Sequence, residues 1–132
     1  MDFTAFKLER DLYQKLSTVV QQPRETVELS HIIKKENKPV YCADLFLKNG
    51  CKALKMKGPA VIEVKKNPLF DTVSQQQKAF DRIKPCGIKT FILAVDELNG
   101  YVKLTKKGEF KVVKLEDFCS KIKNISAVDN VN

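Results

Sequence analysis

Several features are scarce or missing in this sequence of 132 residues, and each gap excludes a class of protein. The chain has one histidine, and its four cysteines form no Cys-x-x-Cys pair, so a zinc site is not expected. No apolar run approaches the roughly 18 to 20 residues that cross a bilayer, and the N-terminus is too acidic for a secretory signal. We therefore expect a cytoplasmic protein without a membrane segment, whose thiols are reduced and mostly buried.

Motifs for nucleotide binding and for triad hydrolysis are also missing. The sequence contains neither G-x-x-x-x-G-K-[ST] nor G-x-G-x-x-G, so no phosphate-binding loop is indicated. His31 is the single histidine, and no serine or cysteine triad can be built around it. We expect it to be an ordinary surface or core histidine.

What the chain does have is positive charge. It contains 24 lysines and arginines against 16 aspartates and glutamates, which gives a net charge of +8 and a pI of about 9.3. This balance favours a polyanionic partner through long-range attraction. A solvated, lysine-rich surface without such a partner is the alternative, so motifs must decide.

The apolar pattern predicts one α/β domain over residues 1–125, followed by a flexible tail over residues 126–132. The expected elements are a helix at 3–20, strands at 26–33, 40–47 and 60–66, a helix at 72–83, a strand at 91–97, hairpin strands at 101–106 and 109–115, and a short helix at 116–124. This order predicts a mixed central β-sheet flanked by helices, with a C-terminal β-hairpin and short helix after the core.

Two acids lie on strands where burial makes a charge costly. Asp44 is in the second expected strand, and Glu63 shares a face of the third with Lys65 because residues two apart point the same way. If these strands are neighbours, Asp44 and Glu63 meet at one end of the sheet as two hard oxygen ligands suited to Mg²⁺. The alternatives are a turn-facing Asp44 and an edge salt bridge between Glu63 and Lys65.

The acid-x-Lys triplet by itself is not specific. Glu36 with Lys38 and Glu109 with Lys111 have the same form, and a rival register combines Asp96 with the second of these pairs. The first pair lies in a lysine-rich turn, where a solvated charge cluster explains it. The rival register leaves too little chain for a following helix and strand.

Two further polar residues fall near expected apolar faces. Glu9 lies at the margin of the apolar stripe of the first helix, either as a third acid or as a charge that reaches solvent beside a lysine. Gln76 lies on the inward face of the helix at 72–83, where its amide would orient a phosphate, a water or Glu63, or form an ordinary hydrogen bond. Glu25 and Glu28 are weaker candidates for a third acid.

Asp44 followed by Val61-Ile62-Glu63-Val64-Lys65 resembles the motif of the PD-(D/E)XK nuclease superfamily, which includes restriction endonucleases and Holliday-junction resolvases. The core of that superfamily is a helix, three strands, a helix and a strand, which matches the order expected for residues 3–97. The resemblance thus covers most of the chain. Ala43 stands where the motif name has proline.

The resemblance implies a metal-dependent nuclease. By it, Asp44 and Glu63 bind Mg²⁺, with Mn²⁺ as a substitute, and Lys65 positions or activates the attacking water. The backbone carbonyl of Val64 would add a ligand, since Mg²⁺ takes few side chains. An acid on the first helix often assists, and Glu9 fits. Some members carry a glutamine followed by an aromatic residue four positions later, which Gln76 resembles.

The expected partner is nucleic acid, with DNA favoured although the sequence does not separate it from RNA. A duplex or branched form is expected because few aromatic residues interleave the lysines. The lysines near the motif that would follow the phosphate backbone are Lys48, Lys52, Lys55, Lys57 and Lys66. The alternatives are a catalytically inactive module of this fold that binds nucleic acid, and a module that binds an acidic protein partner. The oligomeric state is open, with a homodimer among the options.

Overall fold

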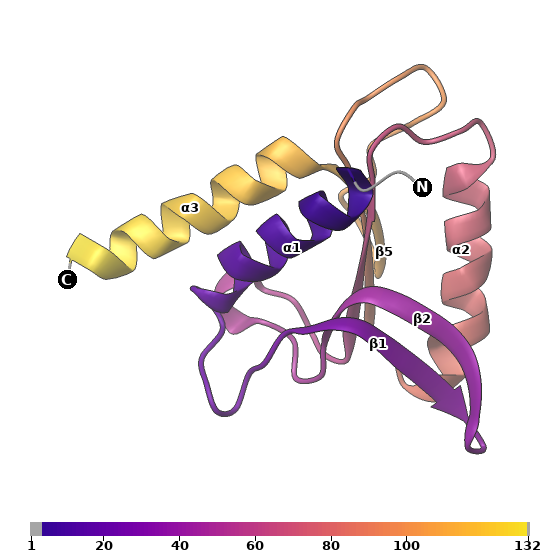
Figure 1. The fold of residues 1–132 in the computed structure, drawn as a ribbon, viewed down its shortest axis with the longest axis horizontal. Helices are drawn as coiled ribbons and strands as arrows, with labels where there is room; N and C mark the ends of the chain where they lie inside the picture. Colours follow the sequence, from indigo (N-terminus) through magenta and orange to yellow (C-terminus); the bar gives the residue numbers. More distant parts are fainter. Residues whose placement is uncertain (1–3, 132) are drawn as a thin grey trace.

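The structure of the protein, a computed structural model, describes residues 4–131 (Figure 1). Its elements, in chain order, are α1 (Thr4–Ser17), β1 (Glu28–Lys35), β2 (Lys38–Leu47), the 3-10 helix η1 (Lys52–Leu54), β3 (Ala60–Lys65), α2 (Thr72–Ile83), the 3-10 helix η2 (Lys84–Cys86), β4 (Thr90–Val95), β5 (Phe110–Lys114) and α3 (Leu115–Val131). The helix, three strands, helix and strand expected from the sequence therefore follow one another as predicted.

A single five-stranded sheet with the order β1-β2-β3-β4-β5 forms the centre of the molecule. β1, β2 and β3 pair antiparallel, whereas β3, β4 and β5 run parallel. A parallel pair needs a crossover, and α2 supplies it between β3 and β4. The mixed sheet flanked by helices is the predicted fold class, and it is confirmed.

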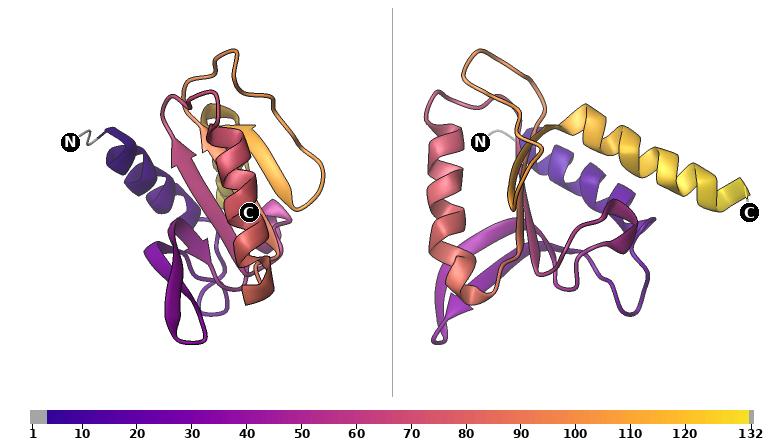
Figure 2. Two further views of the ribbon diagram at one scale, coloured as in Figure 1. Left: turned by 90° about the vertical axis from the view of Figure 1, so that its right-hand side faces the viewer. Right: turned by 180° about the vertical axis from the view of Figure 1, so that it is seen from behind.

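Helices cover both faces of the sheet. Figure 1 shows α1 and α3 on one side and α2 on the other, and the left view of Figure 2 shows α2 in front of the sheet with α3 behind it. Because β4 lies in the middle of the parallel part, all six of its residues are buried, as its continuous apolar run predicted.

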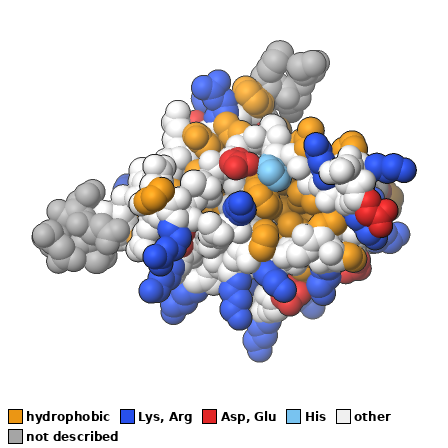
Figure 3. Space-filling view, turned by 90° about the horizontal axis from the view of Figure 1, so that it is seen from below, with side chains coloured by type: hydrophobic (Ala, Val, Ile, Leu, Met, Phe, Trp, Pro, Cys, Tyr) orange, Lys and Arg blue, Asp and Glu red, His pale blue; other side chains and the backbone are white. Residues whose placement is uncertain are grey.

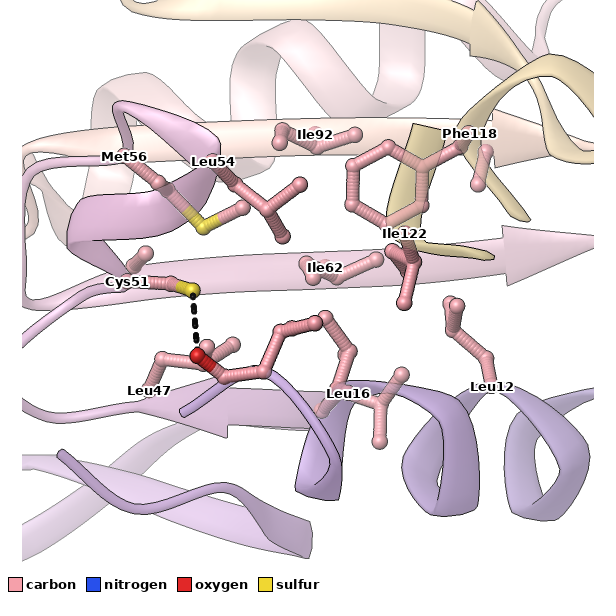
Figure 4. Close-up of a cluster of buried hydrophobic side chains, with 14 of the residues drawn as sticks. Leu12, Leu16, Leu47, Cys51, Leu54, Met56, Ile62, Ile92, Phe118 and Ile122 are labelled. Atoms are coloured by element: carbon pink, nitrogen blue, oxygen red, sulfur yellow. Dashed lines mark hydrogen bonds between the residues drawn. The ribbon is translucent and has the colours of Figure 1, made fainter. Parts of the chain in front are cut away.

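The larger core lies between the sheet and the pair α1 and α3. Figure 4 shows side chains from both helices meeting the strands there. The labelled residues are Leu12, Leu16, Leu47, Cys51, Leu54, Met56, Ile62, Ile92, Phe118 and Ile122. A second cluster, which includes Val61, Phe80 and Phe91, fills the space between the sheet and α2.

The basic stretch between β2 and β3, for which the sequence pattern predicted no structure, forms a closed loop at residues 49–59. The backbones of Cys51 and Met56 exchange two hydrogen bonds, with N···O distances of 2.9 and 3.0 Å. Gly50 and Gly58 allow the loop to close, because a Cβ on Gly58 would lie 2.1 Å from the backbone nitrogen of Gly50. Gly50 also has a φ of 70°, which favours glycine.

The C-terminal part of the chain differs from the prediction. The expected hairpin is wrong: residues 101–108 contain no strand, and one antiparallel bridge between Thr105 and Val112 is all that forms. β5 instead pairs parallel with β4, since the buried central strand needs a neighbour on that edge. The last helix, α3, is longer than expected and continues to Val131, through most of the predicted tail. Residue 132 lies outside the described residues.

The four cysteines are free thiols. Cys51 alone is buried, and its sulfur lies 3.9 Å from the carbonyl oxygen of Val19. Cys42 is exposed, while Cys86 and Cys119 are partly exposed. The prediction of reduced thiols agrees with this, but the prediction that most are buried is wrong.

Candidate active site

The candidate site lies where β2 and β3 separate. Their regular pairing includes Leu47 with Ala60, Phe46 with Val61, and Leu45 with Ile62, and then it stops. The next two residues in register are Asp44 and Glu63, the two acids singled out in the sequence. The strands are neighbours, as the metal-site prediction required.

Side chains replace the missing backbone pairing at this point. Oδ2 of Asp44 accepts a hydrogen bond from the backbone N–H of Val64 at 2.9 Å. Oε1 of Glu63 in turn lies 3.3 Å from the backbone nitrogen of Asp44, which donates to it. The N–H and carbonyl of one strand residue point to the same side of the strand, so the Val64 carbonyl also faces this opening.

A third carboxyl group reaches the site from α1. Glu9 lies close enough to Asp44 for the two carboxyl groups to share a hydrogen bond when one of them is protonated. Glu63 and Asp44 stand in the same relation. The helix packed on one face of the sheet and two strands thus bring three acids together. Of the two alternatives open for Glu9, the structure places it beside Asp44, and its role as a third acid stays a prediction.

From the α2 side, Tyr41 links the acids to Gln76. The hydroxyl of Tyr41 donates to Oε1 of Glu63 at 2.6 Å and lies 3.4 Å from Oε1 of Gln76. Gln76 is therefore in the site, but it reaches Glu63 through Tyr41. The sequence analysis missed Tyr41, because tyrosine is an ordinary strand residue and its spacing from Asp44 carries no signal.

Burial and mutual repulsion control the protonation of the cluster. Burial, aided by the adjacent Asp44, raises the pKa of Glu63 to about 9, although the Tyr41 hydroxyl opposes the rise. Burial and Asp44 likewise raise the pKa of Glu9 to about 7, while the positive charge of Lys65 lowers it. Burial, followed by the nearby Glu63, raises the pKa of Tyr41, so its hydroxyl stays a donor. At neutral pH the carboxyl cluster therefore holds protons.

Lys65 completes the group. It is the last residue of β3, partly exposed, and its ammonium lies near enough to Glu9 to affect the pKa of that acid. No set of three or more acid, histidine or cysteine side chains is arranged to hold a metal ion as it stands, for the residues that the structure describes. Oδ2 of Asp44 and Oε1 of Glu63 are instead engaged in the hydrogen bonds given above.

The five lysines predicted to surround the motif do not lie together. Lys48, Lys52, Lys55 and Lys57 belong to the chain that leads into the start of β3, whereas Lys66 follows its end. A groove at the starts of β3, β4 and β5 is lined by Lys55, Lys57, Lys89 and Lys111. Figure 3 shows one face of the molecule, on which Lys and Arg side chains crowd the lower margin. The expectation of one lysine surface around the acids is therefore wrong, because β3 separates its members.

The other acids considered in the sequence have local partners. Glu25 is 6% exposed, and its carboxylate accepts hydrogen bonds from the backbone N–H groups of Gln21 at 2.9 Å and Lys52 at 2.7 Å. Glu28 pairs with His31 at 2.7 Å. Both acids have a structural explanation.

The rival triplets do not form a comparable cluster. Glu109 forms an exposed ion pair with Lys84 at 3.2 Å. Glu36 is exposed in the turn between β1 and β2. Glu63 is 3% exposed, so of the three triplets only the one on β3 buries its acid.

Searches against family models, curated proteins and solved structures find no match to this chain. No helix in the described part of the chain is long and apolar enough to span a membrane. The geometry and chemistry of the site itself are therefore what indicates a function.

Proposed function

We propose that this protein is a divalent-metal-dependent nuclease that hydrolyses phosphodiester bonds, with DNA as the substrate. The observation that carries the proposal is the convergence of Glu9, Asp44 and Glu63 from α1, β2 and β3, with Lys65 beside them. Glu63 is buried and Glu9 and Asp44 are partly buried, so bringing these three carboxyl groups together costs free energy that packing does not return. A bound ligand that offsets this cost is the simplest reason for the cluster.

The donor set suits Mg²⁺ or Mn²⁺. Carboxylate and carbonyl oxygens are the ligands that these ions take. Burial and the neighbouring Asp44 raise the pKa of Glu9 and of Glu63, and a bound cation would lower both by displacing protons. Asp44 and Glu63 would hold the ion, with Glu9 and the Val64 carbonyl as additional ligands. When bound, the ion would supply charge that offsets the build-up on the phosphoryl oxygens.

The remaining groups position the reactants. Lys65 ends β3 and has its ammonium near Glu9, where it would orient the attacking water and stabilise negative charge on the phosphate. Tyr41 would fix the orientation of Glu63 through its 2.6 Å hydrogen bond. Gln76 would orient Tyr41 or a water from the α2 side.

The resemblance to the PD-(D/E)XK superfamily supports the same proposal. The element order from α1 to β4 agrees with the order which that superfamily implies, and an acid on the first helix, an acid on the second strand and the Glu63-Val64-Lys65 triplet on the third occupy the expected places. The resemblance thus rests on the element order and on the spacing of these residues. It assigns each of them a role, which a single substitution at that residue can test.

One observation favours the second candidate, a catalytically inactive module that binds nucleic acid or a partner protein. As the side chains stand, Asp44 and Glu63 bond to backbone groups and to each other, and no ready-made metal-ligand set is found in residues 4–131. A module of this kind would bind its partner without metal and would be unaffected by Asp44→Asn.

The decisive experiment measures cleavage of plasmid and linear DNA in Mg²⁺ and in Mn²⁺. Glu63→Gln and Lys65→Ala should each reduce the rate by at least about 100-fold. Glu109→Gln is a matched control, since it makes the same change in a triplet of the same form that lies exposed on the surface. It should leave the rate within about 2-fold, because surface ion pairs contribute little.

Metal binding is measured separately by titrating Mn²⁺ into each variant in a calorimeter. The proposal predicts binding to the wild type and to Glu109→Gln, and its loss in Glu63→Gln. Cleavage that is equal in Glu63→Gln and the wild type would refute the nuclease proposal. Metal-independent DNA binding without any cleavage would establish the inactive module instead.

A further inference from the structure

Four large apolar side chains are exposed together beyond the ends of β3 and β4. Leu69 and Phe70 lie in the loop after β3, and Leu98 and Tyr101 lie in the loop after β4. They are 69%, 76%, 43% and 61% exposed, respectively, and we call them the loop platform. Figure 1 shows both loops at the top of the molecule, at the end of the sheet to which β3 and β4 run.

Asn99 fastens the two loops to each other. Its side-chain Nδ2 donates to Oδ1 of Asn67 and to the carbonyl of Pro68, both at 2.8 Å, and its Oδ1 accepts from the backbone N–H of Tyr101 at 2.8 Å. The rings of Phe70 and Tyr101 consequently lie edge to face, with centroids 6.3 Å apart. The two aromatic rings are presented as one pre-formed surface.

The loop platform adjoins the candidate active site along the backbone. Lys65 ends β3, and its carbonyl accepts a hydrogen bond from the N–H of Asp96 at 2.8 Å. Lys66 makes the equivalent contact with Glu97 at 2.7 Å. The loop after β3 therefore starts at the residue proposed to position the attacking water, and the loop after β4 starts beside that residue.

We propose that the loop platform stacks against unpaired nucleobases, so that the substrate of the neighbouring site is single-stranded nucleic acid or a duplex with a single-stranded end. This inference rests on the proposed nuclease function. The two loops carry acids and lysines in similar numbers, so their charge gives no strong attraction for a phosphate backbone, and the exposed rings are the feature that would bind a nucleic acid here. Aromatic faces bind bases that have left the helical stack, because paired bases offer a protein their edges.

This inference replaces the duplex or branched substrate expected from the sequence with a single-stranded one or a duplex with a single-stranded end. Few aromatic residues lie among the lysines, which favoured duplex DNA. The structure instead places the exposed rings of Phe70 and Tyr101 at the opposite end of β3 from the groove of Lys55 and Lys57. A strand whose base contacts the platform would have its adjacent phosphate near Lys65, Asp44 and Glu63.

The test measures binding without divalent metal, by fluorescence anisotropy of a short labelled DNA strand and of the same strand annealed into a blunt duplex. Phe70→Ala with Tyr101→Ala should weaken binding of the single strand by about 10-fold or more and leave duplex binding unchanged. Phe70→Trp should retain binding, and Phe70→Leu should not, since leucine keeps the apolar surface but has no ring. Ile32→Ala, at a 51% exposed residue of β1, is the control.

Three results would overturn the inference: no effect of the double variant on the single strand, an equal loss for single strand and duplex, or no binding of either DNA by the wild type. A change in sedimentation of the double variant with unchanged DNA binding would assign the platform to a second copy of the chain and would also overturn it. Cleavage in Mg²⁺ is read separately. A wild type that shows platform-dependent binding yet cleaves neither DNA would refute the nuclease function alone.

Discussion

The carboxylate of Asp44 accepts a hydrogen bond from the backbone N–H of Val64 at 2.9 Å, in the place of a backbone acceptor from the neighbouring strand. Asp44, which is proposed to bind metal, thus also contributes to the hydrogen bonding between β2 and β3. Removal of its charge and removal of its hydrogen bond are different perturbations, and suitable substitutions separate them.

Asp44→Asn should keep the fold and abolish cleavage. The amide oxygen of asparagine can still accept from Val64, so we expect the free energy of unfolding to stay within about 1 kcal/mol of the wild type. Asp44→Ala leaves that N–H without a partner and should cost about 1–3 kcal/mol. Urea unfolding at pH 8 measures both. Equal stability of the two variants would show that the hydrogen bond to Val64 does not contribute to the free energy of unfolding.

Glu63→Gln should make the protein less sensitive to alkaline pH when no divalent metal is present. The pKa of Glu63 is raised in the folded state to about 9 from an ordinary 4.5, so its contribution to stability is complete below pH 4.5 and is lost as the pH rises through 9. Glutamine is neutral at every pH. Relative to pH 5, we expect the variant to gain about 4 kcal/mol on the wild type at pH 8.5, because a group of this kind loses about 1.4 kcal/mol for each pH unit between its two pKa values.

Thermal unfolding in EDTA across this pH range gives the comparison. Glu109→Gln serves as the control, because its acid is exposed in an ion pair and should follow the wild-type curve. Parallel curves for Glu63→Gln and the wild type would contradict the assigned protonation.

Tyr41→Phe should shift the pH dependence of cleavage to higher pH. The hydroxyl that donates to Glu63 at 2.6 Å lowers the pKa of that acid, so its loss raises the pKa further and delays the ionisation needed to bind metal. The profile of kcat/KM against pH measures the shift, and Tyr101→Phe, which removes an exposed hydroxyl and keeps its ring, is the control. An unshifted profile would remove Tyr41 from the site.

Glu25→Ala should destabilise the protein without affecting catalysis. This buried carboxylate accepts from the backbones of Gln21 and Lys52 and so joins the chain after α1 to the loop at residues 49–59. Its loss leaves two N–H groups unpaired and should cost about 2–4 kcal/mol. Cleavage per folded molecule should stay at the wild-type level. A selective loss of activity at full stability would place Glu25 in the site.

The three acids could be predicted as candidate site residues from the sequence because each departs from a strong local preference. Asp44 and Glu63 interrupt strands that are otherwise apolar, and Glu9 lies on the margin of an apolar helical stripe. Acids are rare at positions expected to be buried, so these three stand out in the sequence pattern. The metal-site prediction was conditional on β2 and β3 being neighbours, and the structure meets that condition. The sequence pattern carries no comparable signal for Tyr41, whose role depends on a hydroxyl position that strand periodicity does not encode.

The remaining differences come from tertiary packing. Residues 101–106 alternate like a strand, but β5 takes the free edge of buried β4, and only Thr105 bridges back to it. The lysines that are adjacent in sequence to Glu63 are separated in space because β3 runs between them. Proximity along the chain predicts proximity in space poorly where a strand intervenes.

The closed loop at residues 49–59 has a consequence for the lysines that it carries. Its reciprocal bonds between Cys51 and Met56, and the burial of Leu54 in the core, fix its backbone before any partner arrives. A polyanion that meets Lys55 and Lys57 would have to immobilise side chains only, so the entropy lost on association would be smaller than for lysines on an unstructured segment.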